Sequence, residues 1–236
     1  MTCNESYFRY LGQNQEKAQT STPAGGLSSS QQSHRPLVVG LTGGIGTGKS
    51  TFAEALLRQN HQLGRGTSVT HLDADQISRN LTAPNGLALP EIRTEFGQSV
   101  FNGTELDRQA LAQVIFQDES AKKRLEAILH PLIRQEILTG IQTAKEIEHS
   151  VLLDVPLLFE AGLNRICDQI ITITAPLELR IERLTERGIS QPDAQARIAN
   201  QISDQERLNG STWEVHNGGD KRQLSLLAAA FQNLVF

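Results

Sequence analysis

Short apolar runs alternate with amphipathic stretches along most of this chain. Continuous runs of β-branched residues and leucine predict four buried strands, at residues 37–42, 68–72, 151–155 and 170–174. Periodic spacing of apolar residues predicts helices at about 50–57, 177–186, 192–208 and from 221 to the end, with a candidate fifth strand at 213–216. Because parallel strands need crossover connections, this alternation predicts an α/β fold with a parallel sheet flanked by helices.

A long helical stretch separates the second and third predicted strands. Residues 76–147 show helical spacing nearly throughout, with turns at Pro84-Asn85-Gly86 and Asn102-Gly103, and His130-Pro131 interrupts the pattern again. A single crossover helix does not need this many residues. We therefore predict an inserted helical subdomain at about 76–148, which binds the acceptor of the reaction.

The polar composition of residues 1–35 sets them apart from the rest of the chain. Gln, Ser, Thr, Asn and Gly dominate, and such a stretch buries too little apolar surface to offset the entropy lost on ordering. We predict a disordered, low-complexity tail over 1–35 and a folded domain over 36–236. The patch Tyr7-Phe8-Arg9-Tyr10-Leu11 is either a docking motif or an incidental apolar cluster in this tail.

The composition narrows the classes of partner. The net charge is −4 and aromatic residues are 5% of the chain, which disfavours nucleic-acid binding through a basic face or stacked bases. No apolar run is long enough to span a bilayer, no secretory pattern opens the chain, and Cys3 and Cys167 have no partner at metal-ligand spacing. We expect a cytoplasmic protein, monomeric by default, that acts on small molecules and has no nucleic-acid or membrane partner.

Residues 43–50, GGIGTGKS, match the phosphate-binding pattern G-x-x-x-x-G-K-[ST]. The match follows a predicted strand and opens a predicted helix, which is the context that the pattern requires. Glycines let backbone N–H groups turn toward phosphates, Lys49 brings positive charge to the β- and γ-phosphates, and the Ser50 hydroxyl can reach Mg²⁺. The sequence predicts a P-loop NTPase-type sheet that takes ATP and Mg²⁺ through Gly44, Ile45, Gly46, Thr47, Gly48, Lys49, Ser50 and Thr51.

Three carboxylates follow predicted strands, where ligands of open α/β sheets bind. Asp73 and Asp75 end the second strand. Each could accept a proton from an attacking hydroxyl or could cap the helix that follows. Asp154 ends the third strand and is either a partner of Mg²⁺ or an ordinary turn residue before Pro156.

Arginines recur with helical spacing after the fourth predicted strand. Arg180, Arg183 and Arg187 fall on one helix face. This face suits a lid, at about 177–208, that neutralises a transferring phosphate. Alternatively it is a solvated surface on which the neighbouring residues Glu178, Glu182 and Glu186 pair with the arginines.

Several of these segments, taken in order, resemble the dephospho-coenzyme A kinase family. The resemblance covers residues 37–208, and its motifs are VGLTGGIGTGKST at 39–51, DADQISR at 73–79, LDR at 106–108, LHPLI at 129–133, DVPLLFE at 154–160, RLTER at 183–187 and ARIANQ at 196–201. Two departures stand out. Ser78 replaces the usual Ala before Arg79, and residues 211–219 keep Asn217 and Gly219 of the family's C-terminal motif but lose its acidic residue.

The resemblance implies a P-loop α/β core with a helical CoA domain and a lid. It implies transfer of phosphate from ATP to the ribose 3′-hydroxyl of dephospho-CoA, which gives CoA and ADP. By motif position, Asp75 is the base and Arg79 lies beside the acceptor, with Arg108 and His130 in the acceptor subdomain. Lys49, Arg183 and Arg187 complete the catalytic set, and Ser50 and Asp154 are the candidate metal ligands.

Three other classes of function compete with this one. The nearest is another small-molecule P-loop kinase, of the nucleoside, nucleotide or shikimate type, although the long helical insert favours a bulky acceptor. A nucleotide-dependent switch is disfavoured because the chain has no N-K-x-D motif and because a switch needs no arginine-lined lid. An ATPase that processes nucleic acid is disfavoured by the acidic charge balance.

Overall fold

The computed structural model describes residues 6–12, 35–63 and 68–235. The chain forms two compact units, one from residues 1–71 and 144–236 and the other from residues 72–143. The first unit contains a six-stranded sheet, and the second is mostly helical.

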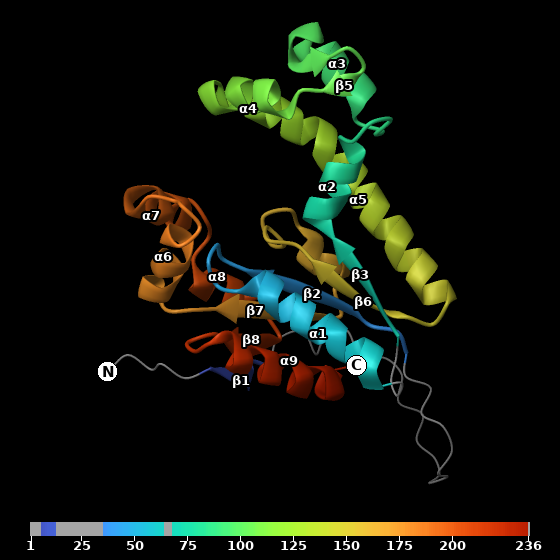
Figure 1. Ribbon diagram of the computed structural model, residues 1–236. Coiled ribbons are helices and arrows are strands. Elements are labelled where there is room, and N and C mark those ends of the chain that lie inside the picture. Colours follow the sequence, from blue (N-terminus) through green and yellow to red (C-terminus); the bar gives the residue numbers. More distant parts are fainter. Residues whose placement is uncertain (1–5, 13–34, 64–67, 236) are drawn as a thin grey trace. The chain divides into compact units, whose positions relative to one another are not determined.

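The sheet has the strand order β1-β8-β7-β2-β6-β3 (Figure 1). Its strands are β1 (Tyr7–Tyr10), β2 (Val38–Gly43), β3 (Val69–Asp73), β6 (Ser150–Asp154), β7 (Gln169–Thr174) and β8 (Trp213–His216). β2 pairs in parallel with β6 and β7, and β7 pairs in parallel with β8. All of β2 is buried, which explains its mainly apolar sequence. The predicted α/β fold with a mostly parallel sheet is confirmed.

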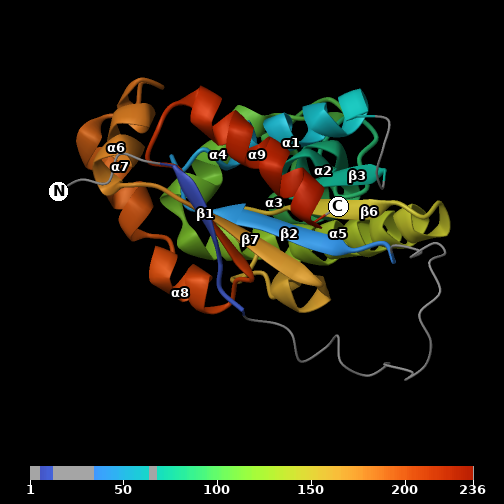
Figure 2. The same ribbon diagram turned by 90° about the horizontal axis from the view of Figure 1, so that it is seen from below.

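Two helices cover one face of this sheet, as both ribbon views show (Figures 1 and 2). They are α1 (Lys49–Leu63) and α9 (Lys221–Val235), which pack against each other. The rings of Phe52 in α1 and Phe231 in α9 lie 6.1 Å apart, and Phe231 also meets Trp213 of β8 edge to face at 5.4 Å. This buried aromatic cluster fixes the start of α1, and with it the loop that precedes α1, against the sheet.

Three shorter helices follow β7, namely α6 (Leu177–Thr185), α7 (Gln191–Ala199) and α8 (Asp204–Asn209). The prediction of a single helix over 192–208 is therefore wrong, because α7 ends at Ala199 and a separate helix, α8, begins at Asp204. Ser203 starts α8 with a capping box: its hydroxyl accepts from the N–H of Glu206 at 3.1 Å, and the Glu206 carboxylate accepts from the N–H of Ser203 at 2.8 Å.

The N-terminal strand β1 is a second difference from the sequence prediction. Tyr7–Tyr10 pair antiparallel with Trp213–His216 at the edge of the sheet. Residues 1–35 are mostly polar, but the aromatic side chains of this strand provide apolar surface. The ring of Tyr10, for example, lies 4.7 Å from that of Trp213. The prediction that residues 1–35 stay outside the fold is wrong for this strand, and residues 1–5 and 13–34 lie outside the described residues.

The second unit has its own apolar core. Its elements are α2 (Ala74–Leu81), α3 (Leu89–Phe96), the 3₁₀ helix η2 (Gln98–Val100), the hairpin of β4 (Phe101–Asn102) and β5 (Glu105–Leu106), α4 (Arg108–Gln117) and most of α5 (Glu119–Glu146). The predicted turn at Asn102-Gly103 is the tip of the hairpin. The core consists of apolar side chains from these elements, among them Leu81, Leu89, Ile92, Val100, Leu111, Leu125 and Ile128.

Helix α5 continues through His130-Pro131, where the sequence pattern predicts an interruption. The helix spans 28 residues with Pro131 inside it. Proline removes one backbone N–H and crowds the preceding turn, but Leu125 and Ile128 before it and Ile133 after it pack in the core of the unit and hold the helix there. Among the described residues, no helix combines the length and the apolar character needed to cross a membrane.

Candidate active site

The loop between β2 and α1 carries the predicted phosphate-binding residues. Gly46 and Gly48 have φ angles of +81° and +95°, which favour glycine. A Cβ at Gly48 would lie 2.4 Å from Nδ2 of Asn217, so this position leaves no room for a side chain. The Thr47 hydroxyl donates to the carbonyl oxygen of Gly44 at 2.8 Å and closes the loop. The loop leads into the N-terminus of α1, where the helix dipole favours a bound anion.

Lys49, the first residue of α1, forms an ion pair with Asp154 at the end of β6. The other carboxylate oxygen of Asp154 lies 3.7 Å from Nε2 of His71. Burial alone would raise the pKa of Asp154, but contact with His71 and the charge of Lys49 outweigh burial and lower it. Asp154 is therefore an anion at neutral pH, and it orients the lysine at the mouth of the phosphate loop.

Arg180 of α6 lies beneath the phosphate loop rather than on an open face. Its side chain is buried, its Nε donates to the carbonyl oxygen of Ile45 at 2.9 Å, and Nη1 lies 3.3 Å from a carboxylate oxygen of Asp204. A Cβ at Gly44 would lie 2.3 Å from Nη2 of Arg180. Arg180 thus fits neither alternative from the sequence, because it supports the loop backbone instead of facing a ligand or solvent.

Arg183 and Arg187 occupy different environments one turn apart. Nη1 of Arg183 donates to the carbonyl oxygens of Gly46 at 3.2 Å and Thr47 at 3.3 Å, and Nη2 donates to that of Gly219 at 3.2 Å. Arg187 is exposed, and no residue that the structure describes pairs with its guanidinium group. The predicted pairing with interleaved glutamates is also not seen for either arginine among the described residues.

A cavity of about 640 Å³ opens beside the phosphate loop within the first unit. It is lined by residues of the phosphate loop, α1, α6 and the turn after it, the loop after β8, and the start of α9, among them Gly48, Thr51, Arg183, Arg187, Asn217 and Lys221. The volume falls in the range of small-molecule sites. The cavity therefore has the size for a nucleoside, and the phosphate loop lies at its edge.

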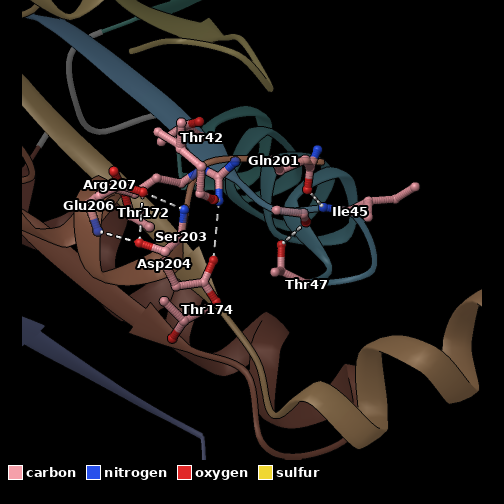
Figure 3. Close-up of polar contacts among 12 residues, drawn as sticks. Thr42, Ile45, Thr47, Thr172, Thr174, Gln201, Ser203, Asp204, Glu206 and Arg207 are labelled. Carbon is pink, nitrogen blue, oxygen red and sulfur yellow. Dashed lines mark hydrogen bonds and ion pairs between the residues drawn. The ribbon is translucent and has the colours of Figure 1, made fainter. Parts of the chain in front are cut away.

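Two amide side chains at this site received no role from the sequence. Oε1 of Gln201, just after α7, accepts from the N–H of Ile45 at 2.8 Å (Figure 3). Nδ2 of Asn217, just after β8, donates to the carbonyl oxygen of Thr47 at 2.8 Å. Both residues lie in segments that resemble the family, which is the signal that could have singled them out, but their contacts depend on tertiary folding.

A buried ionic cluster holds α8 near the phosphate loop (Figure 3). Arg207 is fully buried, with Nη1 3.3 Å from Asp204 and Nη2 3.6 Å from Glu160. Asp204 also pairs with Arg180, so one carboxylate joins both arginines. The cluster connects the helices after β7 to the backbone of the loop, so α8 and the loop keep a fixed geometry.

In the second unit, the two aspartates of the DAD motif have separate roles. Oδ1 of Asp73 accepts from the N–H groups of Asp75 at 2.8 Å and Gln76 at 3.1 Å, so Asp73 is the N-cap of α2. Asp75 lies in the first turn and is exposed, and its carboxylate has no hydrogen bond or ion pair to the described residues. Of the two alternatives, Asp73 is occupied by capping and Asp75 is available for a ligand.

The predicted acceptor residues lie on the surface of the second unit. Arg79 in α2 and Arg108 at the start of α4 are brought together, since Nη2 of Arg108 donates to the carbonyl oxygen of Arg79 at 3.1 Å. His130 is exposed in α5. A cavity of about 230 Å³ lies on the same unit, lined by Ile77, Asn80, Leu81, Asn85, Gly86, Leu87 and Glu136. Two of the three predicted acceptor residues, Arg79 and Arg108, thus neighbour each other.

Known proteins resemble this chain over most of its length. The family model for dephospho-CoA kinase matches residues 37–223. A dephospho-CoA kinase of Deinococcus radiodurans is 42% identical over 206 residues, 84% of this chain and 93% of the relative. One from Frankia casuarinae is 40% identical over 182 residues, 77% of this chain and 76% of the relative.

Solved structures resemble the chain as well. A crystal structure of a Thermus thermophilus protein has a TM-score of 0.67 at 32% identity and covers 86% of this chain and 99% of its own. A dephospho-CoA kinase from Campylobacter jejuni has a TM-score of 0.56 at 26% identity, with 85% and 97% covered. With the phosphate loop, Lys49 and the DAD motif in place, the chain belongs to the dephospho-CoA kinase family.

Proposed function

We infer that this chain catalyses the last step of coenzyme A biosynthesis, the transfer of the γ-phosphoryl group of ATP to the ribose 3′-hydroxyl of dephospho-CoA. The observation that carries the inference is the phosphate loop with Lys49 beside a nucleoside-sized cavity, in a chain of this family. A kinase of this class works mainly by positioning two substrates and neutralising charge. No second function is favoured by a specific observation.

ATP binds through the first unit in this proposal. Backbone N–H groups between Gly44 and Thr51 hold the phosphates, and the cavity beside Asn217 takes the nucleoside. Lys49 stabilises charge on the β- and γ-phosphates as the bond to the bridging oxygen breaks. Arg187 and Arg183 supply further positive charge. Arg187 is the freer of the two to reach phosphate, because Arg183 is bonded to backbone carbonyls.

The residues present fit a magnesium ion held mainly by phosphate oxygens and water. The hydroxyl of Ser50 is exposed in the first turn of α1, which suits a single protein ligand. Asp154 is already paired with Lys49 and His71, so it would help to hold the ion less directly than Ser50. Among the described residues, no cluster of three or more His, Cys, Asp or Glu side chains forms a separate metal site. Mg²⁺ would neutralise phosphate charge when bound.

Dephospho-CoA binds through the second unit in this proposal. Asp75 accepts the proton of the 3′-hydroxyl while the oxygen attacks the γ-phosphorus. Its carboxylate is exposed and has no partner among the described residues, which suits a residue that awaits a substrate proton. Arg79, Arg108 and His130 bind the acceptor. The guanidinium group of Arg108 lies against the backbone of Arg79, so these two cationic residues are neighbours, which suits the pyrophosphate of dephospho-CoA. We also propose that the protein is monomeric and located in the cytoplasm.

A coupled ADP-release assay tests the proposal. The purified full-length protein is given ATP and Mg²⁺ with dephospho-CoA, adenosine, AMP or shikimate as acceptor. We expect turnover with dephospho-CoA alone and a product phosphorylated at the ribose 3′ position. Turnover with one of the other acceptors and none with dephospho-CoA would assign the chain to a different small-molecule kinase.

A further inference from the structure

Strand β1 lies outside the part of the chain that the family model matches, which begins at residue 37. It nevertheless forms the edge of the main sheet, paired antiparallel with β8 (Figure 1). The register pairs Tyr7 with His216 and Tyr10 with Trp213. β1 is therefore attached to the strand that leads directly into the loop His216–Gly219.

The two faces of β1 carry different chemistry, because side chains alternate along a strand. Phe8 and Tyr10 pack on Trp213 on one face, at ring distances of 6.5 Å and 4.7 Å. On the other face, Tyr7 stacks on His216 at 4.9 Å, and Nη2 of Arg9 lies 2.5 Å from a carboxylate oxygen of Glu214. We call the face with Phe8 and Tyr10 the aromatic face, and the face with Tyr7 and the Arg9–Glu214 ion pair the ionic face.

The ionic face contains a buried carboxylate that needs its partner. Glu214 is 4% exposed, and its other carboxylate oxygen accepts from the Thr174 hydroxyl at 2.9 Å. Arg9 is the cation that the structure pairs with Glu214. A buried carboxylate without a counter-charge is unfavourable, so loss of Arg9 would disturb β8 at Glu214.

Ser6, the residue before β1, also holds the far end of the loop. The hydroxyl of Ser6 accepts from the N–H of Gly219 at 2.9 Å, while Tyr7 covers His216. Both ends of the loop His216–Gly219 are thus fixed by two consecutive residues of the N-terminal segment.

The loop so fixed contacts the phosphate loop. Asn217 donates to Thr47, and Arg183 donates to the carbonyl oxygens of Gly219 and Gly46. Asn217 and Gly219 also line the 640 Å³ cavity. A shift of the loop would change the nucleotide cavity and the phosphate loop together.

We propose that β1 is a positioning element of the nucleotide site: Ser6 and Arg9 hold the loop His216–Gly219 in the position that binds ATP, without touching ATP themselves. This rests on the proposed function for the identity of the nucleotide. The competing view is that β1 only stabilises the sheet edge. The aromatic face of β1 would serve that purpose alone, so the two faces can be tested separately.

The test measures steady-state kinetics and melting temperature of variants in the full-length chain. Ser6→Ala and Arg9→Glu should each raise KM for ATP by about fivefold, since Ser6→Ala removes the hydrogen bond to Gly219 and Arg9→Glu replaces the ion pair with Glu214 by like-charge repulsion. We expect kcat to stay within about a factor of two and KM for dephospho-CoA to stay unchanged, because the change acts before the chemical step. Arg9→Lys should restore most of the ATP affinity.

Phe8→Ala is the matched control on the aromatic face. It should lower the melting temperature and leave KM for ATP unchanged. Unchanged KM in both Ser6→Ala and Arg9→Glu would overturn the proposal, and so would an equal rise of KM in Phe8→Ala. If the parent chain does not phosphorylate dephospho-CoA, the proposed function fails by itself. Calorimetric binding of a non-hydrolysable ATP analogue to the same variants then tests the positioning role.

Discussion

The charged groups at the phosphate loop and those on the helical unit differ in how firmly they are held. The side chain of Lys49 is 13% exposed and paired with a buried aspartate, whereas the side chain of Arg79 is 57% exposed and 4.0 Å from Asp73. Arg180 and Arg183 are tied to the backbone of the loop, while Asp75 and His130 face solvent. The proposed nucleotide side is therefore held in place by contacts within the folded chain, and the proposed acceptor side is solvated.

The phosphate loop and the helical unit should therefore respond differently to mutation. A substitution at the phosphate loop removes an interaction that the folded protein already makes, so it should reduce both stability and activity. A substitution of Asp75 or His130, which are exposed on the helical unit, removes an interaction proposed to exist only with substrate, so it should reduce activity alone.

The largest effect is expected for Lys49→Ala. The rate of phosphoryl transfer should fall on the order of 10³-fold because a cation at the transferring group is lost. The melting temperature should also fall, because Asp154 remains buried without its counter-charge. Single-turnover rates and thermal melts measure the two effects. Lys49→Ala with Asp154→Asn should recover the melting temperature but not the rate, and recovery of the rate would remove Lys49 from catalysis.

Asp75→Asn tests the acceptor side. Turnover should fall by about 10²-fold or more, because the base is lost, with no change in melting temperature or ATP affinity. Asp73→Ala is the contrasting variant, since it removes the cap of α2 and should cost about 1 kcal/mol of stability. Near-normal turnover of Asp75→Asn would exclude Asp75 as the base. Equal loss of stability in both variants would break the distinction between them.

Arg187→Ala and Arg183→Ala compare a cation just after α6, unpaired among the described residues, with a hydrogen-bonded cation inside α6. Arg187→Ala should lower kcat by about tenfold or more without a change in melting temperature, since only its contact with phosphate is lost. Arg183→Ala should lower both, because the carbonyl oxygens of Gly46, Thr47 and Gly219 lose their donor. Kinetics and melts on the same preparations decide the matter. A melting temperature that falls equally in both variants would contradict this assignment.

The smallest effect on stability is expected for His216, the first residue of the loop His216–Gly219. Burial lowers the pKa of His216 below its ordinary value of 6.5, Glu214 opposes this and Arg9 adds to it. The unfolded chain then binds more protons, so stability should rise as the pH increases from the lowered pKa toward 6.5 and change little above. His216→Asn should flatten this slope in urea unfolding between pH 5 and 7. An unchanged slope would show that His216 does not contribute.

Local sequence patterns were enough to predict the parallel sheet and the phosphate loop. Both depend on signals confined to a few neighbouring residues, such as the apolar run of β2 followed directly by the glycines. The strand β1 could not be predicted in this way. Its apolar surface is completed by Trp213, which is distant in sequence, and no local pattern records that partner.

The residues of the candidate site also differ in whether local sequence patterns could predict them. Lys49, Ser50 and the loop glycines follow from the motif itself, and the roles of Asp75, Arg79, Arg108 and His130 were assigned by resemblance and stay predictions. Periodicity placed Arg180 with Arg183 and Arg187, but only the fold shows that Arg180 is buried under the loop backbone. Gln201 and Asn217 reach the loop through tertiary contacts that spacing along the chain does not reveal.

Strand β1 also imposes an order on the assembly of the sheet. Arg9 and Glu214 are 205 positions apart, so a growing chain makes β1 long before its partner strand is synthesised. Pairing over this separation carries a large loop-closure entropy, which places it late in folding. The aromatic residues of β1 must remain in water until β8 leaves the ribosome and joins β7. Of the strands that the structure describes, the one translated first is thus among the last to be paired.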